Sequence, residues 1–346
     1  MPEKSRPRIL MIYTGGTIGM KENPETKALE PLDFDHLLDN VPKLKKLDFD
    51  ISHLQFQHPI DSSDMNPHCW ARIAGWIDEN YHQYDGFVVL HGTDTMAYTA
   101  SALSFMLQQL SKPVIITGSQ LPIGEVRTDG EENLITALQI AAAKDNDGRP
   151  MVREVAILFE NYLWRGNRST KRSADNFNAF RSNNYPELAK IGLGIYFNKE
   201  ALWRSPVKDA PLDVHYQMDT NIAFIDIFPG IQENVVNHIL NTPGLKGVVL
   251  KTYGAGNAPG EAWLGKALRE AVDKGIVVVN VTQCQNGEVD PYRYKAGLAL
   301  AQSGIVSGHD LTSEAALTKL MYLLGRGLKP TQVMHYMESN LCGEMS

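Results

Sequence analysis

Four residues with complementary chemistry stand at three places along the 346-residue chain: Thr17, Thr93 with Asp94, and Lys171. A threonine hydroxyl is a weak nucleophile at neutral pH and needs a neighbouring group to activate it. A lysine can act as the base when its surroundings favour the neutral amine, and an aspartate can orient it. The four residues therefore indicate covalent catalysis through a threonine, provided that the fold brings them together.

The stretch 8–20, RILMIYTGGTIGM, has the pattern of a strand that ends at a sharp turn. Its apolar run is typical of a strand buried on both faces of a parallel sheet. Gly15 and Gly16 allow backbone angles closed to other residues, so Thr17 is expected in a loop at the carboxyl end of the strand, where open α/β sheets bind ligands. By itself, a Gly-Gly-Thr turn is more often an ordinary strand-to-helix connection.

The same order of apolar strand, polar loop and helix recurs along the first half. We expect strands at 86–91, 113–118 and 154–159 and helices at 67–81, 97–107 and 130–143. Strands that alternate with helices predict a parallel, right-handed α/β layer whose loops meet at one edge. A basic window at 163–174 includes Lys171, although such a cluster is more typical of a solvated face.

The periodicity fades and prolines appear between 182 and 221. We therefore predict an amino-terminal domain at 1–195, a connection at 196–220 and a carboxyl-terminal domain at 221–346. The second half repeats the rhythm, with strands at 222–227, 247–253 and 275–281 and helices at 232–240, 261–274 and 313–324. The expected fold is a larger parallel-sheet α/β domain followed by a smaller three-layer α/β domain.

Composition argues against several classes of partner and site. A net charge of −7 gives no general attraction to nucleic acid or to anionic membranes, and the absence of a long apolar segment favours the cytoplasm. Cys69, Cys284 and Cys342 form no CxxC pair, so buried thiols are expected rather than disulfides or a zinc site. The histidines lack metal-ligand spacing, and His91 is interpreted as a core or backbone-bonded residue.

Four motifs together resemble those of the bacterial-type L-asparaginases: TGGTIG at 14–19, DSSDM at 61–65, HGTDTM at 91–96 and RGNRSTK at 165–171. The segments YGAGNAP at 253–259 and TQC at 282–284 extend the resemblance over nearly the whole chain, and the spacing points to the cytosolic type I branch. The resemblance implies hydrolysis of L-asparagine to L-aspartate and ammonia with no metal or other cofactor. It also implies assembly as a homodimer or homotetramer.

The resemblance assigns roles to individual residues. Thr17 is the nucleophile that becomes acylated, and the second catalytic group comprises Thr93, Asp94 and Lys171. The substrate's α-amino and α-carboxylate groups are held by Asp61, Ser62 and Ser63, and Asp94 also meets the amino group. Without the resemblance, the residues at 61–63 are better explained as helix-entry residues than as ligand contacts.

Two features depart from the family pattern. The polar stretch 21–31 is expected to be a lid or a plain surface loop, yet 18–30 lacks the tyrosine that many members carry there, and Tyr13 lies on the wrong side of the turn. Some members have a regulatory asparagine site; here Lys251 replaces its arginine, while Thr282 and Cys284 are kept. Because lysine cannot grip a carboxylate with a bidentate fork, we expect weak or absent allosteric activation.

Three alternatives remain open. A glutaminase and a tRNA-dependent amidotransferase subunit are the nearest enzymes, although that subunit usually carries an additional domain ahead of the TGGT motif, which starts here at Thr14. The third alternative is an amino-acid sensor without catalytic activity. It is disfavoured by the intact set of Thr17, Thr93, Asp94 and Lys171.

Overall fold

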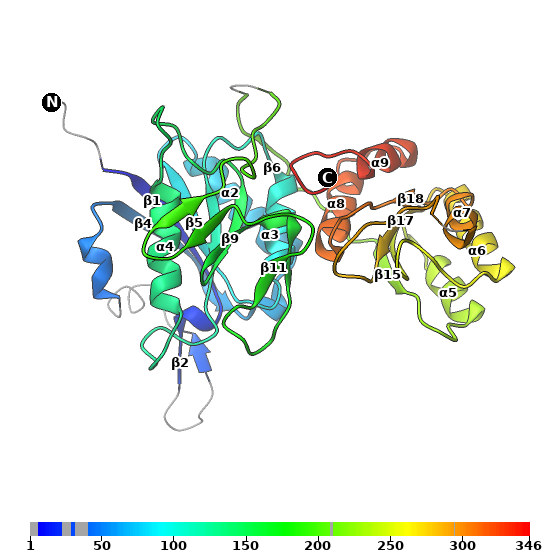
Figure 1. The fold of residues 1–346 in the computed structure, drawn as a ribbon, viewed down its shortest axis with the longest axis horizontal. Helices are drawn as coiled ribbons and strands as arrows, with labels where there is room; N and C mark the ends of the chain where they lie inside the picture. Colours follow the sequence, from blue (N-terminus) through cyan, green and yellow to red (C-terminus); the bar gives the residue numbers. More distant parts are fainter. Residues whose placement is uncertain (1–5, 23–28, 32–40, 208–209, 294) are drawn as a thin grey trace. The chain divides into compact units, whose positions relative to one another are not determined.

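The computed structural model describes residues 6–22, 29–31, 41–207, 210–293 and 295–346 (Figure 1). They divide into two compact units, Met1–Tyr216 and Gln217–Ser346. Within the described parts of the chain, no helix is both long enough and apolar enough to cross a membrane.

A mixed eight-stranded sheet forms the centre of the first unit, in the order β13-β12-β9-β8-β7-β5-β1-β4. Its strands are β1 (Arg8–Gly15), β4 (Asp50–Ile60), β5 (Gly86–Leu90), β7 (Val114–Thr117), β8 (Val155–Phe159), β9 (Tyr162–Arg165), β12 (Ala189–Ile191) and β13 (Ile195–Phe197). The expected parallel arrangement holds for β4, β1, β5, β7 and β8. Beyond β8, the strands β9, β12 and β13 pair antiparallel.

Helices cover this sheet and explain why its central strands are continuously apolar. They are α2 (Pro67–Asn80), α3 (Met96–Met106) and α4 (Gly130–Ala142). Helix α4 packs in one cluster with Met11, Val88 and Ile115, while α3 contacts β7 and β8. Helix α2 begins where predicted, because the side chain of Asn66 accepts hydrogen bonds from the first free N–H groups.

Short elements complete the first unit. The two-stranded ribbons pair β2 (Met20–Glu22) with β3 (Leu29–Pro31), β6 (Leu107–Gln108) with β14 (Asp213–Val214), and β10 (Ser169–Lys171) with β11 (Phe180–Ser182). The 3-10 helices are η1 (Thr17–Gly19), η2 (Pro42–Lys46), η3 (Ser62–Asp64) and η4 (Gly166–Arg168). The ends of the predicted lid stretch thus pair as strands, and its centre, 23–28, lies outside the described residues. The predicted connection at 196–220 contains the end of β13 and all of β14.

The second unit has the three layers expected from its sequence. Its parallel sheet runs in the order β15 (Ile222–Asp226), β16 (Gly247–Thr252), β17 (Val277–Thr282) and β18 (Val306–Ser307). The helices are α5 (Glu233–Leu240), α6 (Ala262–Asp273), α7 (Lys295–Ala301), α8 (Ser313–Gly325) and α9 (Pro330–Met337). Figure 1 shows α5 and α6 on one side of the sheet and α8 and α9 on the other.

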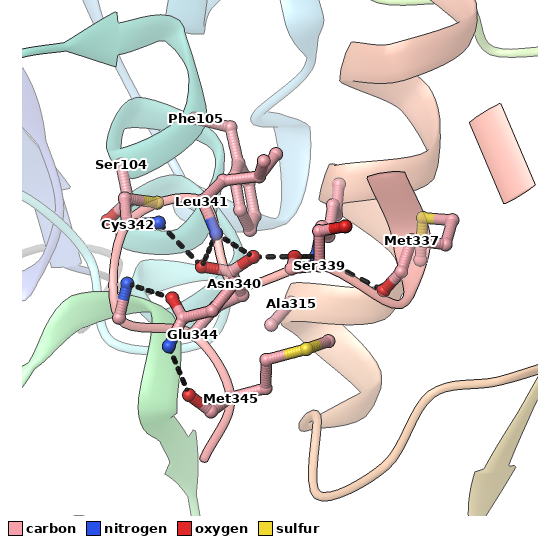
Figure 2. Close-up of polar contacts among 12 residues, drawn as sticks. Ser104, Phe105, Ala315, Met337, Ser339, Asn340, Leu341, Cys342, Glu344 and Met345 are labelled. Atoms are coloured by element: carbon pink, nitrogen blue, oxygen red, sulfur yellow. Dashed lines mark hydrogen bonds and ion pairs between the residues drawn. The ribbon is translucent and has the colours of Figure 1, made fainter. Parts of the chain in front are cut away.

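A buried ion pair fixes the chain that follows α9 against α8 (Figure 2). The Nζ atom of Lys319 lies 2.6 Å from Oε1 of Glu344, and both side chains are 0% exposed. Lys319 also donates to the carbonyl oxygens of Met337 at 3.2 Å and Ser339 at 2.6 Å. Burial lowers the pKa of Lys319, and the Glu344 carboxylate opposes that effect. Because each of its three N–H donors has an acceptor, the ammonium group is fully hydrogen-bonded.

The expectation that all three cysteines are buried is wrong. Cys284 is exposed, and Cys69 and Cys342 are half-buried; all three are free thiols. Cys284 lies two residues after the end of β17, at the edge of the second sheet. Position after a buried strand therefore did not imply burial of this thiol.

Candidate active site

Glycine contacts bring the ends of three neighbouring strands together. In the sheet, β1 lies between β4 and β5. A Cβ atom on Gly15 would lie 2.2 Å from the carbonyl oxygen of Ile60, and one on Gly16 would lie 2.3 Å from the backbone nitrogen of Gly92. Both residues also have positive φ angles, 123° and 89°. Only glycine fits these positions without strain, so the turn before Thr17 packs directly against the loops after β4 and β5.

Thr17 lies at the start of η1, half-buried between residues that are buried on either side. A hydrogen bond fixes the turn, because the hydroxyl of Tyr13 donates to the carbonyl oxygen of Gly19 at 3.2 Å. The backbone N–H of Ile123 donates to the carbonyl of Ile18, also at 3.2 Å. Among the described residues, the Thr17 hydroxyl has no hydrogen-bond partner. Tyr13 is 0% exposed and supports the turn, so it does not occupy the place of a lid tyrosine.

Lys171 joins the two catalytic candidates of the loop after β5. Its Nζ atom lies 2.8 Å from Oγ1 of Thr93 and 2.6 Å from Oδ1 of Asp94. Helix α3 begins just after this loop and contacts η4 and β10, which brings Lys171 to the same edge. The Lys171 side chain is 17% exposed and that of Asp94 65% exposed. An ion pair this open adds little stability, so its main effect is to orient the groups that it joins.

The predicted substrate-binding residues lie on η3, beside the Thr17 turn. Oδ1 of Asp61 accepts the N–H of Ser63 at 2.8 Å, which is the predicted helix-entry geometry. Ser62 is buried, and its carbonyl accepts the hydroxyl of Thr95 at 2.6 Å. The side chains of Asp61 and Ser63 are exposed at the same edge. Helix entry and solvent exposure therefore coexist in Asp61 and Ser63.

Sequence reasoning missed Gln120, which extends this hydrogen-bonded group. The hydroxyl of Thr93 donates to Oε1 of Gln120 at 3.3 Å. The Nε2 group of Gln120 donates to the carbonyls of Ala174 at 3.4 Å and Asn176 at 3.0 Å, beyond Lys171 in the chain. Gln120 follows β7, which pairs parallel with β5. Its position after a buried parallel strand was the signal that could have found it.

A buried chain of hydrogen bonds supports the loop after β5. Trp70 Nε1 donates to Oγ1 of Thr99 at 2.9 Å, and Thr99 lies 2.8 Å from Nε2 of His91. The Nδ1 atom of His91 lies 2.6 Å from the carbonyl oxygen of Gly92. Because a carbonyl can only accept, Nδ1 carries the proton and Nε2 accepts from Thr99. Burial lowers the pKa of His91 to about 4. Its interpretation as a core, backbone-bonded histidine is confirmed.

The basic window before Lys171 is not a solvated face. Arg165 and Arg168 are 3% and 2% exposed. Nε of Arg165 lies 2.7 Å from Oε2 of the buried Glu154, and its guanidinium group stacks over the ring of Tyr185 at 4.3 Å. A buried cation needs such partners. The spacing of basic residues in the sequence does not show that Glu154 and Tyr185 supply them. The segment leading to Lys171 is consequently anchored to the sheet.

In the second unit, the candidate regulatory residues lie at the carboxyl edge of the parallel sheet. Nζ of Lys251, on β16, lies 3.6 Å from Oδ2 of Asp226 at the end of β15. Thr282 ends β17, where its hydroxyl donates to the carbonyl of Gly254 at 2.6 Å. The same hydroxyl oxygen accepts the N–H of Cys284 at 3.0 Å. The three residues thus share one edge, on strands β16 and β17 and the turn that follows.

Comparison with known proteins agrees with this arrangement. Residues 8–203 match the family model "Asparaginase, N-terminal", and residues 221–337 match "Glutaminase/Asparaginase C-terminal domain". L-asparaginase 1 of Escherichia coli K12 is 44% identical over 339 residues, which is 98% of each chain.

Two solved structures extend the likeness to three dimensions. L-asparaginase I from Vibrio cholerae is 41% identical, with a TM-score of 0.89 over 99% of this chain and 100% of that chain. The thermostable L-asparaginase from Thermococcus kodakarensis is 32% identical, with a TM-score of 0.88 over 98% and 99% of the two chains. The chain therefore belongs to the asparaginase family.

Proposed function

We propose that this protein hydrolyses L-asparagine to L-aspartate and ammonia through an acyl-enzyme formed on Thr17. One observation carries the proposal: Lys171 Nζ lies 2.8 Å from Thr93 Oγ1 and 2.6 Å from Asp94 Oδ1, at the edge where the glycine turn holds Thr17. The substrate is supported by the relative named L-asparaginase 1, which matches 98% of this chain at 44% identity.

In the first step, the hydroxyl oxygen of Thr17 attacks the side-chain amide carbon of asparagine. The hydrogen-bonded group of Thr93, Lys171 and Asp94 takes up the hydroxyl proton and returns it to the leaving ammonia. Backbone N–H groups near Gly92 and Thr93 stabilise the oxyanion, a contribution of about 3–4 kcal/mol per donor in other enzymes. Water then attacks the acyl-enzyme with the help of the same group, which releases aspartate and restores Thr17.

Substrate orientation is assigned to η3 and Asp94. The carboxylates of Asp61 and Asp94 complement the α-ammonium group of the substrate, and the hydroxyls of Ser62 and Ser63 complement its α-carboxylate. The exposure of Asp61 and Ser63 at the same sheet edge supports this division. Asp61→Asn should therefore raise KM for asparagine more than it lowers kcat.

Ammonia release from L-asparagine, L-glutamine and D-asparagine tests the central assignment. We expect Thr17→Ala to lower kcat by at least about 1,000-fold, because the nucleophile is lost. Thr242→Ala, at an exposed position of the second unit, is the matched control and should keep full activity. Full activity of the Thr17 variant would remove the assignment. A preference for glutamine would indicate a glutaminase, and asparagine binding without ammonia release would indicate a sensor.

For regulation, we propose that asparagine activates this protein weakly or not at all. The geometry around Lys251 supports this view, because its ammonium group already faces Asp226 at 3.6 Å. Gln283 Nε2 donates to the same carboxylate at 2.6 Å and holds it in place. Rate curves against asparagine should be hyperbolic for the wild type and for Lys251→Ala. A sigmoidal curve that becomes hyperbolic in the variant would contradict the proposal.

The likeness to the type I branch also supports a cytoplasmic location and assembly as a homodimer or homotetramer. Light scattering on the purified protein measures the assembly directly. A mass equal to that of one chain, at concentrations where the enzyme is active, would refute the oligomeric part of the proposal. Neither statement affects the chemistry assigned to Thr17.

A further inference from the structure

We propose that the first unit has a second binding site, for a phosphate group, at the sheet edge opposite the catalytic loops. A pocket of about 240 Å³ is lined by three arginines and by polar residues, including Arg149, Arg153, Arg204, Gln109, Ser111 and Ser205. Ser111 precedes β7 and Arg153 precedes β8, so the pocket lies at the amino ends of these strands. In contrast, the loops that carry Thr17 and Thr93 follow the carboxyl ends of β1 and β5.

The pocket concentrates positive charge. Its described lining contains three guanidinium groups and no carboxylate. Outside the lining, Asp145 lies 2.8 Å from Arg153, and the carboxylates of Asp145 and Glu154 also attract Arg204. Arg149 is exposed, and its side chain has no hydrogen-bond or ion-pair partner among the residues that the structure describes. Burial and the neighbouring Arg153 lower the pKa of Arg204, and the carboxylates of Glu154 and Asp145 oppose this effect only in part. A bound oxyanion would relieve this crowding of like charges.

Two of the three guanidinium groups, those of Arg153 and Arg204, are held in place and still have free donors. Arg153 donates from Nε to the carbonyl of Pro150 at 3.0 Å and from its terminal nitrogen to Asp145 at 2.8 Å. Arg204 donates to two backbone carbonyls, at 2.9 and 3.3 Å. A guanidinium group has five N–H donors, so each of these arginines keeps donors for a ligand. Arg153 and Arg204 are therefore positioned before any anion binds, and the exposed side chain of Arg149 completes the set.

The opposite wall of the pocket is also fixed. Gln109 adopts a left-handed backbone conformation with φ of 63°, which is uncommon for a residue other than glycine. Its side-chain oxygen accepts the hydroxyl of Ser205, whose oxygen in turn accepts the N–H of Val207 at 3.2 Å. The hydroxyl of Ser111 lies 3.0 Å from that of Tyr81. These hydrogen bonds fix polar groups of Gln109, Ser111 and Ser205 in the lining of the pocket that contains the arginines.

The size of the pocket and its three guanidinium charges favour a doubly charged phosphate group over a singly charged anion. A volume of about 240 Å³ holds several waters at roughly 30 Å³ each, but is smaller than the roughly 300–1,000 Å³ of sites for drug-sized ligands. Planar guanidinium forks match the oxygen atoms of phosphate in pairs. The ligand is thus inorganic phosphate or the phosphoryl group of a metabolite whose remainder stays outside the pocket.

Calorimetric titration of the full-length protein with inorganic phosphate tests the site. Glycerol 3-phosphate distinguishes a phosphate monoester from the free ion, while succinate and chloride at equal ionic strength are the control anions. We expect Arg149→Gln to weaken phosphate binding by about 10-fold or more, since charge-assisted hydrogen bonds are lost. The double variant with Arg204→Gln should show no binding. Arg72→Gln, at an exposed position of α2, should bind as the wild type does.

Two outcomes would overturn the proposal: phosphate binding no tighter than that of succinate or chloride, or unchanged phosphate binding by Arg149→Gln. Arg149 has no side-chain partner among the described residues, so its variant should fold normally, which thermal unfolding can verify. The calorimetric readout does not depend on asparagine hydrolysis. A failure of this proposal is therefore separate from a failure of the proposed function.

Discussion

Protonation of His91 should make the first unit lose stability as the pH falls from 7.5 to 5. The imidazole is fully buried, and burial lowers its pKa from 6.5 to about 4. Over this range, His91 binds a proton in the unfolded chain but stays mostly neutral in the folded chain. Folding stability therefore falls as the pH drops below 6.5, and the loss is complete only below about pH 4.

The size of this effect follows from the two pKa values. One pKa unit corresponds to about 1.4 kcal/mol, so the difference of about 2.5 between the two values amounts to about 3 kcal/mol in full. At pH 5, where the folded histidine is still mostly neutral, about 2 kcal/mol of that total should already be lost. The figure is an order-of-magnitude value for the His91 contribution alone.

Urea unfolding at pH 7.5 and pH 5 measures the contribution. His91→Gln removes the titrating group, so this variant should lose about 2 kcal/mol less than the wild type between the two pH values. His68→Gln, at an exposed position of α2, is the matched control and should lose as much as the wild type. An equal loss in the wild type and the His91 variant would refute the reasoning.

Three further predictions concern other positions. Lys319→Met should destabilise the second unit by about 3–5 kcal/mol, because Glu344 is left buried without its partner; adding Glu344→Leu should recover most of that loss in urea unfolding. Gly16→Ala should lower kcat by about 100-fold or more with an unchanged circular dichroism spectrum, since a Cβ atom there displaces the turn that carries Thr17, the proposed nucleophile. Wild-type kcat would contradict the steric argument. Gln120→Ala should lower kcat by about 10-fold with a smaller change in KM, because the Thr93 hydroxyl loses an acceptor; an effect on KM alone would assign Gln120 to substrate binding instead.

The sequence predicts the parallel centre of the first sheet because its strands are short, apolar and separated by helices. The same rule fails beyond β8. There β9 follows after a two-residue turn and runs antiparallel, and β12 and β13 have only three residues each. Such short strands have too few residues to show a period, so only pairing with a neighbour defines them.

The meeting of Lys171 with Thr93 and Asp94 at one sheet edge was predictable from the sequence, but contacts with distant tertiary partners were not. Lys171 and Arg165 belong to the same basic window, yet Lys171 reaches the catalytic loop while Arg165 is buried on Glu154. Charge pattern alone cannot separate these outcomes, because the partner lies elsewhere in the chain. Gln120 was missed for a similar reason, since a single glutamine has no motif of its own.

The contact between Gly16 and Gly92 joins two loops through backbone atoms alone. Neither residue has a side chain that can change rotamer and absorb a shift, so a displacement of one loop has to be transmitted to the other. The turn that carries Thr17 and the loop that carries Thr93 should consequently move as one rigid body. Any closing motion around a substrate would then have to come from segments outside this pair of loops.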